Sequence, residues 1–280
     1  MKKITRRSFL AAAGLTAAAL ALTACGGSSS STASSTASSA AASSEAASSS
    51  AAAELTTVEA GKLTMATNAA FPPYEMTTDT GAFEGIDVDT AQAIAEKLGL
   101  ELQIDDMDFD AALLSVQQGK ADIVMAGVTV TDERKNVMDF SDSYATGIQS
   151  IIVPEGSDIA SPDDLAGKKI GTQRGTTGYI YCSDDFGDEA VVAYDDGLTA
   201  VQALNNGQVD AVVIDNAPAQ EFVAANPGLV ILDTSYAEED YAIGMAKGNT
   251  ALVDAVNAAL EELKADGTLQ SIVDKYIVAE

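Results

Sequence analysis

Beyond about residue 60, short apolar runs alternate with segments in which apolar residues recur every three or four positions. The apolar runs predict strands at "KLTMATN" (62–68), "LQIDDM" (102–107), "ADIVMAGV" (121–128), "GIQSIIVP" (147–154), "KKIGTQRG" (168–175) and "VDAVVIDN" (209–216). The periodic segments predict helices at 89–100, 110–120, 198–208, 250–267 and 268–277. We expect the first helix to be capped by Asp87 or Asp89 and to end at Gly99. The alternation indicates an α/β fold with mostly parallel sheets flanked by helices.

The chain contains an internal repeat. "SVQQGKADIVMAG" and "QALNNGQVDAVVID" share a helix, a glycine turn, an aspartate and a strand in the same order. Asp122 aligns with Asp210, and Gly127 falls opposite Asp215. The alternative to a true repeat is a chance match, because the order helix, glycine turn, strand is common. The repeat predicts two similar lobes, each with a residue at the carboxyl end of an equivalent strand, where open α/β sheets bind ligands.

The N-terminus has the pattern of an export signal. Residues 1–24 have a basic start, an apolar stretch too short for a membrane span, and a small-residue end, which predicts a signal peptide. "TRRSFL" suggests the twin-arginine route, and the general secretory route stays open. "LTAC" resembles a lipobox, which predicts a lipid on Cys25, although an ordinary signal with a chance cysteine is the alternative. Residues 25–59 are rich in Ser and Ala and predict a tether without a core.

Composition excludes several functions. The chain has no histidine, which removes Ser-His and Cys-His catalysis and the usual zinc sites. Its net charge of −27 disfavours nucleic acid and anionic lipid. "SDDFGDE" does not match a calcium loop, and no cofactor or metal is expected. Cys182 has no partner if Cys25 is lipidated, and we interpret it as a small, partly buried apolar residue.

The segment "GKADIVMAGVTVTDERK" (119–135) raises a question about Arg134. Thr131 is expected to cap a helix there, and a cation in the first turn is unfavourable unless it serves a purpose. Together with the Thr129 hydroxyl and N–H groups near Gly127, the guanidinium would form a receptor for a carboxylate. Surface pairing of Arg134 with a nearby aspartate is the alternative.

The second lobe offers a complementary charge. Asp215 ends the equivalent strand and would receive an ammonium, unless it only caps the helix that follows. "GTQRGTTG" (171–178) could add hydroxyl and N–H groups to the anion side, but it lacks the lysine and spacing of phosphate loops. The two lobes therefore predict a receptor for a zwitterion.

Six motifs occur together: "ATNAAFPPYE", "GIDVDTAQAIAEKLG", "AGVTVTDER", "FSDSYATG", "IGTQRGTTG" and "DAVVIDNAPA". In this order they resemble the bacterial extracellular solute-binding proteins of the polar amino acid class, which have the periplasmic-binding-protein type II fold. The resemblance spans residues 60 to 280, and Thr90 departs from it where the family usually has an apolar residue. It implies two lobes, 60–148 with 246–280 and 149–245, joined by two hinge crossings that Gly147 and Gly244 would ease.

The resemblance also implies roles for residues. Arg134 would clamp an α-carboxylate, helped by the Thr129 and Thr177 hydroxyls and by the N–H groups of Gly127 and Thr177. Asp215 would take the α-ammonium, and the side chain of the ligand would meet Asn68, Phe71 and Gln173. The full expected set of ligand-binding residues is Arg134, Asp215, Thr129, Gly127, Thr177, Thr176, Phe71, Asn68, Gln173 and Tyr74, with the tyrosines (also Tyr144 and Tyr179) equally able to be core residues. Because Asn68 is neutral where basic-amino-acid binders often have an acid, a neutral polar amino acid or cystine is preferred over Lys or Arg.

The function implied is that of a monomeric lipoprotein on the outer face of the cytoplasmic membrane. It would capture an amino acid between closing lobes and deliver it to an ABC permease and its ATPase, with no enzymatic activity. One rival is a sensor domain that acts on a membrane partner. Another is a cleft dehydratase that uses Glu75 as its acid.

Overall fold

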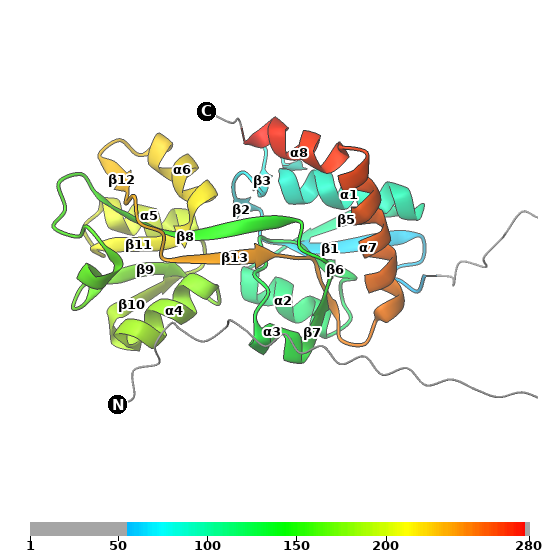
Figure 1. Cartoon of the computed structure of the whole chain (residues 1–280), viewed down its shortest axis with the longest axis horizontal. Coiled ribbons are helices and arrows are strands. Elements are labelled where there is room, and N and C mark those ends of the chain that lie inside the picture. Colours follow the sequence, from blue (N-terminus) through cyan, green and yellow to red (C-terminus); the bar gives the residue numbers. More distant parts are fainter. Residues whose placement is uncertain (1–54, 278–280) are drawn as a thin grey trace, which may run out of the picture. The chain divides into compact units, whose positions relative to one another are not determined.

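A computed structural model describes residues 55–277 of the chain. The predicted signal peptide, Cys25 and most of the predicted tether lie outside these residues. Within 55–277, no helix is long and apolar enough to cross a membrane. The strands form two large sheets and one small sheet, with helices packed against the large ones (Figure 1).

The first large sheet has the strand order β5-β1-β6-β14-β7. Its strands are β1 (Lys62–Thr67), β5 (Glu101–Asp106), β6 (Ile123–Val124), β7 (Met138–Phe140) and β14 (Gly244–Ala246). β5, β1 and β6 are parallel, whereas β14 runs antiparallel to both of its neighbours. The helices of this part are α1 (Ile86–Leu98), α2 (Phe109–Gln117), α3 (Asp132–Val137), α7 (Thr250–Ala265) and α8 (Thr268–Tyr276). We call this sheet and its helices lobe 1.

The second large sheet has the order β10-β9-β11-β8-β12, and β13 also pairs with β8. Its strands are β8 (Ala145–Pro154), β9 (Ile170–Gln173), β10 (Val191–Tyr194), β11 (Ala211–Asp215), β12 (Leu229–Ile231) and β13 (Ala237–Tyr241). β10, β9 and β11 are parallel, and β8 is antiparallel to β11, β12 and β13. The helices are α4 (Thr177–Phe186), α5 (Gly197–Asn205) and α6 (Asn216–Ala225), with 3-10 turns η1 (Pro162–Leu165) and η2 (Asp188–Ala190). We call this sheet and its helices lobe 2.

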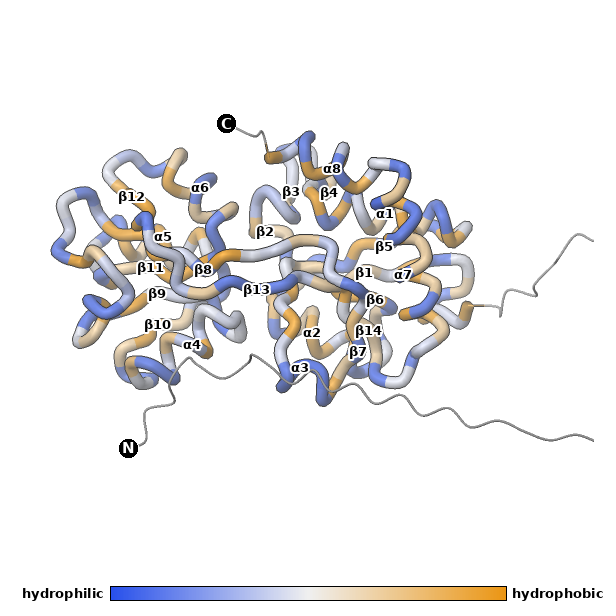
Figure 2. Tube along the Cα trace, viewed as in Figure 1, coloured by the Kyte–Doolittle hydropathy of each residue, from blue (hydrophilic) through white to orange (hydrophobic). Residues whose placement is uncertain are grey.

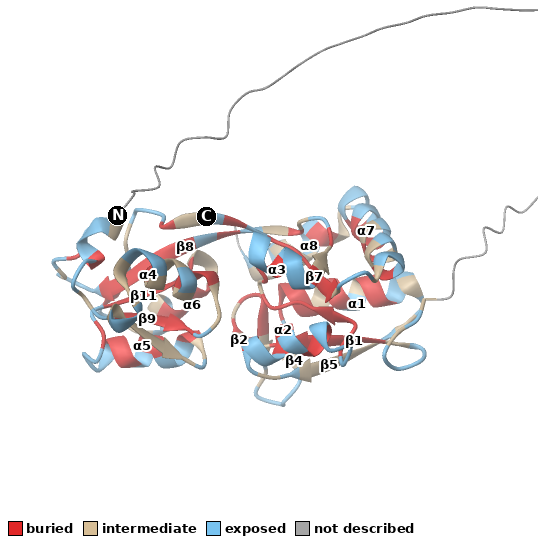
Figure 3. Cartoon of the chain, turned by 90° about the horizontal axis from the view of Figure 1, so that it is seen from below, coloured by how far each residue is buried: buried red, intermediate tan, exposed pale blue. Residues whose placement is uncertain are grey.

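The central strands carry the core. Leu63, Met65 and Ile123 in lobe 1 and Ile151 and Ile170 in lobe 2 are fully buried. Most residues of β1, β8, β9 and β11 are buried, whereas β5 and β13 carry polar residues (Figures 2 and 3). Strands covered on both faces need continuous apolar runs, which explains why these segments were recognisable in the sequence.

The internal repeat has a structural counterpart. Asp122 accepts a hydrogen bond from the N–H of Thr64 (2.8 Å), and Asp210 accepts one from the N–H of Lys169 (2.7 Å). In each lobe the aspartate therefore joins the start of one parallel strand to the start of the next. Gly127 follows β6 and Asp215 is the last residue of β11, so both lie at the carboxyl ends of strands, where the repeat predicted a ligand site.

Two strands connect the lobes. β8 and β13 lie side by side as an antiparallel pair, with Tyr241 opposite Ala145 and Ala237 opposite Gln149 (Figure 1). A Cβ atom on Gly147 would lie 2.4 Å from the Tyr241 ring, so close packing requires a glycine here. The expected boundary at residue 148 lies within β8, whereas the one at residue 245 lies within β14 of lobe 1, beyond the β13 crossing.

Some local predictions were wrong or incomplete. The N-cap of α1 is Gly85, with Asp87 and Asp89 inside the first turn and no side-chain cap, whereas Gly99 ends the helix in the left-handed conformation as expected. A Cβ on Gly244 would lie 2.7 Å from the Val124 side chain, so packing again explains the residue. The sequence reading missed a small sheet of three short strands, β2 (Ala70–Phe71), β3 (Glu75–Thr77) and β4 (Phe83–Glu84).

The Gly147 contact yields a stability prediction. Gly147→Ala should destabilise the protein by about 1–3 kcal/mol, because the added methyl group overpacks the buried Tyr241 ring. Urea denaturation followed by circular dichroism measures the change. Thr146→Ala is the matched control, since Thr146 is the exposed neighbour on the same strand. Equal stability of the two variants would show that the strands move apart at no cost.

Candidate ligand-binding site

A pocket lies between residues of lobe 1 and lobe 2, with about 330 Å³ of space that no atom fills. This volume includes space open to solvent, so the lining residues, and not the volume, indicate what the pocket binds. Its lining consists of Asn68, Phe71, Glu75, Phe109, Ala126, Gly127, Thr129, Arg134, Gln173, Thr176, Thr177 and Asp215. Nine of the ten residues expected from the sequence therefore line one pocket, and the exception is Tyr74.

Arg134 enters the pocket from the first turn of α3. Its N–H is capped by the Thr131 hydroxyl (3.1 Å), as expected. The guanidinium is buried, donates to the carbonyl of Thr129 (2.8 Å) and lies 5.3 Å from the centre of the Phe109 ring. Within residues 55–277 it forms no ion pair, so the alternative of surface pairing does not apply. A buried guanidinium without a counter-ion is a receptor for an anion.

Contacts across the pocket hold the lobes together. Arg134 also donates to the carbonyl of Gly175 in lobe 2 (3.1 Å), and the Gln173 amide donates to Asn68 in lobe 1 (2.8 Å). Gly175 has φ +73°, and a Cβ on it would lie 1.7 Å from a carboxylate oxygen of Asp110 in α2. Only glycine fits the backbone conformation and the close approach together.

Gly127 shapes the floor of the pocket. It has φ +54°, and a Cβ on it would lie 2.8 Å from the Phe71 ring. Its N–H donates to the carboxylate of Asp87 (3.0 Å), so this group is not available to a ligand carboxylate as the sequence reading expected. The role of Gly127 is thus to let Phe71 approach and to leave its carbonyl available.

Asp215 ends β11 and points into a network of hydrogen bonds. It occupies the N-cap position of α6 but makes no side-chain cap, which removes the capping alternative. Instead its carboxylate accepts from the Gln149 amide (2.8 Å) and from the Tyr241 hydroxyl. Burial, aided by the charge of Glu239, raises the pKa of Asp215 to about 7, while the Tyr241 hydrogen bond opposes the rise. A cation beside it would restore the ionised form.

Glu239 lies on β13, behind the pocket lining. One of its carboxylate oxygens accepts from the hydroxyls of Thr177 (3.0 Å) and Thr129 (3.2 Å) and from the amide of Gln149 (3.0 Å). Both hydroxyls therefore donate their hydrogen bonds to Glu239. The anion receptor that remains consists of Arg134 and the free N–H groups at the start of α4, where Thr177 is the first residue.

Glu75 lines the pocket as a second acid. It is fully buried on β3, opposite Phe71, and neither carboxyl oxygen accepts a hydrogen bond from a described donor, while a protonated Glu75 can donate to the neighbouring Asp87. Burial and the neighbouring Asp87 hold its pKa well above the usual range. Asp87 itself has a pKa raised to about 6 by burial, although hydrogen bonds from Gly127 and the Tyr144 hydroxyl oppose the rise.

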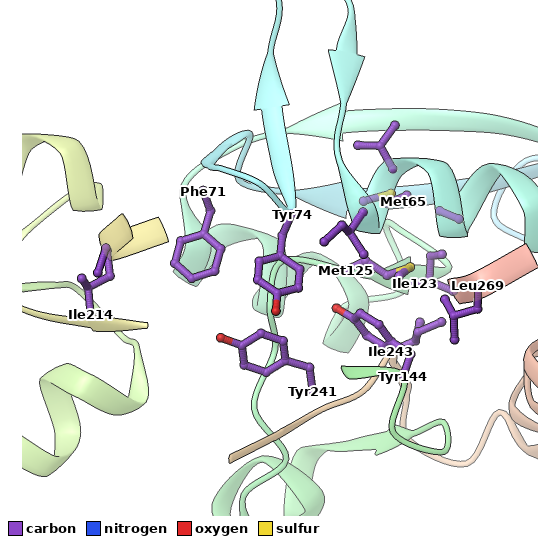
Figure 4. Packing of buried hydrophobic residues seen from close by; sticks show 14 of the residues in the cluster. Met65, Phe71, Tyr74, Ile123, Met125, Tyr144, Ile214, Tyr241, Ile243 and Leu269 are labelled. Atoms are coloured by element: carbon purple, nitrogen blue, oxygen red, sulfur yellow. The ribbon is translucent and has the colours of Figure 1, made fainter. Parts of the chain in front are cut away.

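Aromatic rings form the walls. Phe71 lines the pocket and stacks on Tyr74 at 5.9 Å between ring centres. Tyr74 in turn meets the edge of Tyr241 at 5.3 Å, so it supports Phe71 from the core instead of lining the pocket as expected (Figure 4). Tyr144 is likewise a buried core residue whose hydroxyl donates to Asp87 (2.8 Å). Thr176 lines the pocket, but its hydroxyl caps α4.

Sequence reasoning missed five participants: Glu75 as a pocket acid, Phe109, Ala126, Gln149 and Glu239. Glu75 was considered only as the acid of an enzyme, although its position next to the Phe71 motif placed it at the site. Phe109 comes directly before the predicted helix 110–120, and nothing in its local pattern indicated a pocket residue. β13 was not recognised because "AEEDY" is too polar to resemble a buried strand.

No metal or redox centre emerges from the described residues. No group of three or more acidic or cysteine residues there could hold a metal ion. Cys182 is buried, and burial raises the pKa of its thiol to about 12, which makes it an unreactive core residue.

Comparison with known proteins adds the family. Residues 63–279 match the family of bacterial extracellular solute-binding proteins, family 3. The chain belongs to this family. The match covers nearly all of the two described lobes, so the resemblance inferred from six sequence motifs is confirmed.

Individual relatives in the family are similar over most of their length. The L-cystine-binding protein TcyJ of Escherichia coli (strain K12) is 34% identical over 226 residues, which are 79% of this chain and 85% of that protein. A solved structure of an ancestral arginine-binding protein bound to arginine is 42% identical with a TM-score of 0.74, covering 78% of this chain and 98% of that one. The arginine-, lysine-, histidine-binding protein ArtJ of Geobacillus stearothermophilus is 34% identical with a TM-score of 0.75, covering 78% and 96%. The two-lobed periplasmic-binding-protein type II fold is thereby confirmed, and this family consists of transport proteins.

The raised pKa of Asp215 predicts how stability depends on pH. An ordinary aspartate ionises near pH 4 in the unfolded chain, whereas Asp215 holds its proton to about pH 7 in the fold. The folded state binds more protons in this range, so Asp215 by itself should lower the stability of the ligand-free protein by up to about 1.4 kcal/mol per pH unit as pH rises from 4 to 7.

Asp215→Asn should flatten this dependence in part, since Asp87 contributes the rest. Urea denaturation at half-unit pH steps measures the slope, and Asp233→Asn, at an exposed position, is the control. A slope in the variant equal to that of the wild type would contradict the assignment.

Proposed function

We propose that this protein captures a free L-amino acid between its two lobes for an ABC importer. The observation that carries the proposal is the placement of Arg134 from lobe 1 and Asp215 from lobe 2 around one pocket. An α-carboxylate pairs with the guanidinium, and an α-ammonium pairs with the aspartate. Each charge is buried without a counter-ion in the described structure, so the zwitterion supplies what both lack.

Binding and closure are coupled in this arrangement. The carboxylate and ammonium receptors lie on different lobes, so only the closed form makes both sets of contacts, and the ligand shifts the population toward it. Arg134 uses two donors for carbonyls, at Thr129 and Gly175, and the guanidinium has five. The contact between the lobes therefore leaves donors for a ligand carboxylate.

The side chain of the ligand is cationic, with L-arginine as the leading candidate. After an α-carboxylate and an α-ammonium are paired, the lining still holds Glu75, whose two oxygens accept no hydrogen bond from residues 55–277 and whose neighbour Asp87 is also an acid. Phe71 and Phe109 offer flat apolar faces of the kind on which a guanidinium stacks. Relatives named as arginine-binding proteins support this choice. The sequence-based preference for a neutral amino acid rested on Asn68, and Glu75 outweighs it.

A neutral polar amino acid is the second candidate. It is favoured by the Asn68–Gln173 amide pair, which lines the pocket and could bond an amide side chain, and by a structure of the ancestral relative bound to glutamine. In that case Glu75 stays protonated, as its raised pKa allows. Cystine is also tested as a ligand, because the relative TcyJ is named as an L-cystine-binding protein.

The remaining parts of the proposal concern place and partners. The lipobox at Cys25 and the Ser-rich segment support a lipid-anchored monomer on the outer face of the cytoplasmic membrane. The partners are an ABC permease and its ATPase, as for the relatives named as ABC transporter proteins. The rival reading, a sensor domain that acts on a membrane partner, would bind the same amino acid in the same pocket. A dehydratase using Glu75 is disfavoured because the family consists of transport binding proteins.

A ligand panel tests the proposal. Thermal melts of residues 54–280 with each common amino acid and cystine should show one strong class of hits, with L-arginine first, because a ligand at a hundred times its Kd adds about 2.7 kcal/mol. Arg134→Ala and Asp215→Asn should each weaken binding by about 30-fold or more, since each leaves a buried ligand charge unpaired. Glu75→Gln should reduce the preference for arginine over glutamine by a similar factor.

Arg174→Ala is the matched control, since this neighbouring arginine is exposed and pairs only weakly with Asp195 at 3.8 Å. It should bind as the wild type does. No stabilisation by any amino acid would contradict the proposal, and a hit restricted to neutral amino acids would leave only the second candidate.

Closure has a separate test. Gly175→Ala should weaken amino acid binding by at least tenfold, because its methyl group collides with Asp110 of the opposite lobe. Gly207→Ala is the control: Gly207 has a similar φ of +67° but nothing within 4 Å of an added Cβ. Both variants should lose about 1–2 kcal/mol of stability from the left-handed backbone. Isothermal titration calorimetry separates them, and equal affinity in both would show that the lobes need not approach this closely.

A further inference from the structure

Glu239 is a buried acid that no part of the proposed binding scheme has used so far. It lies on β13, the strand that returns to lobe 1, and pairs there with Gly147 of the other crossing strand. Its side chain is 7% exposed, yet it is not part of the pocket lining. It reaches the ligand only through the residues it contacts.

Those contacts come from both lobes. The Thr129 hydroxyl belongs to the loop after β6 of lobe 1, and the Thr177 hydroxyl belongs to the first turn of α4 in lobe 2. Both donate to the same carboxylate oxygen, at 3.2 and 3.0 Å. Gln149 donates to that oxygen at 3.0 Å and to Asp215 at 2.8 Å, so one amide also joins the two acids.

The direction of these hydrogen bonds has a consequence for the ligand. A hydroxyl has one proton to donate and lone pairs that accept. When the proton of Thr129 or Thr177 is directed at Glu239, only acceptor capacity is left on the hydroxyl oxygen of these two lining residues, and on Thr177 part of it faces the Gln149 amide at 3.4 Å. An acceptor attracts an ammonium and repels a carboxylate.

We propose that Glu239 is a positioning residue that sets the polarity of the pocket. By accepting the protons of Thr129 and Thr177, it turns both hydroxyl oxygens into acceptors for the α-ammonium of the ligand. The ammonium receptor then consists of Asp215 with two hydroxyl oxygens, and Arg134 is left to the carboxylate. This reverses the role that family resemblance gave to the two hydroxyls.

The opposite polarity conflicts with the observed contacts. If the hydroxyls donated to a ligand carboxylate, Glu239 would lose two of its donors and remain buried with only Gln149. Its other oxygen accepts no hydrogen bond of good geometry among the described residues, although the Tyr181 hydroxyl lies near the carboxylate. A buried carboxylate that loses donors costs more than an ordinary unsatisfied group.

A comparison of two ligands tests the inference, which rests on the proposed function. L-arginine carries the α-ammonium, and 5-guanidinopentanoate is the same molecule without it. In the wild type, arginine should bind more tightly by a large factor. Glu239→Gln removes the charge and offers an amide N–H to the hydroxyl oxygens, so it should weaken arginine binding by at least tenfold and leave the affinity for the analogue within about threefold.

Glu238→Gln is the matched control, because Glu238 is the exposed neighbour on the same strand. It should leave both affinities unchanged. A merely structural role for Glu239 would lower the melting temperature and weaken both ligands equally, which would overturn the inference. If the panel identifies another amino acid, that molecule and its analogue without the ammonium replace this pair. Failure of the wild type to bind any amino acid would contradict the proposed function itself.

A double-mutant cycle identifies the route of the effect. Thr129→Val removes one hydroxyl and keeps the shape of the side chain. If Glu239 acts through that hydroxyl, Glu239→Gln should weaken arginine binding at least threefold less in the Thr129→Val background than in the wild type. Independent effects, which multiply, would mean that Glu239 does not act through Thr129, and the inference would fail.

Discussion

Four buried carboxyl groups share the centre of this protein with one buried guanidinium. Glu75, Asp87, Asp215 and Glu239 are each less than a tenth exposed, and Arg134 is the cation among them. Such an excess of acids is costly in a medium of low polarity, and the fold limits the cost with hydrogen bonds and with raised pKa values. A ligand that carries positive charge relieves this imbalance, so the electrostatics of the ligand-free site already define what it is built to bind.

Tyr241 links this charged centre to the crossing strands. Its ring packs against Gly147 of β8 and the edge of Tyr74, and its hydroxyl donates to Asp215. On the same strand, Glu239 receives the hydroxyls of both lobes. The strand that carries the chain back to lobe 1 is therefore also the back wall of the site, which places the ligand contacts and the hinge on one element. A change in either affects the other through direct packing.

The sequence was sufficient for what depends on local pattern. Apolar runs and helical periodicity located most strands and helices, and motifs placed nine of ten expected residues on the pocket. The sequence was insufficient where contacts between distant segments determine the role of a residue. Asp87 resembles a helix cap but accepts from Gly127, and Gly147 resembles a hinge but makes room for a ring. Glu239 lies in a strand so polar that its burial depends entirely on partners distant in sequence.

The same limit explains why the charge of the ligand cannot be predicted from one position alone. Asn68 is neutral, but in the fold its amide is engaged by Gln173 and by the carbonyl of Met107, so its identity says little about the ligand by itself. The charge that matters is the sum over the pocket, where Glu75 remains after every other group has a partner in the proposed complex. An isolated acid of this kind is stable only while protonated or paired with a cation. The specificity of the site thus follows from which of these two states the ligand favours, and a cationic ligand side chain favours the ionised one.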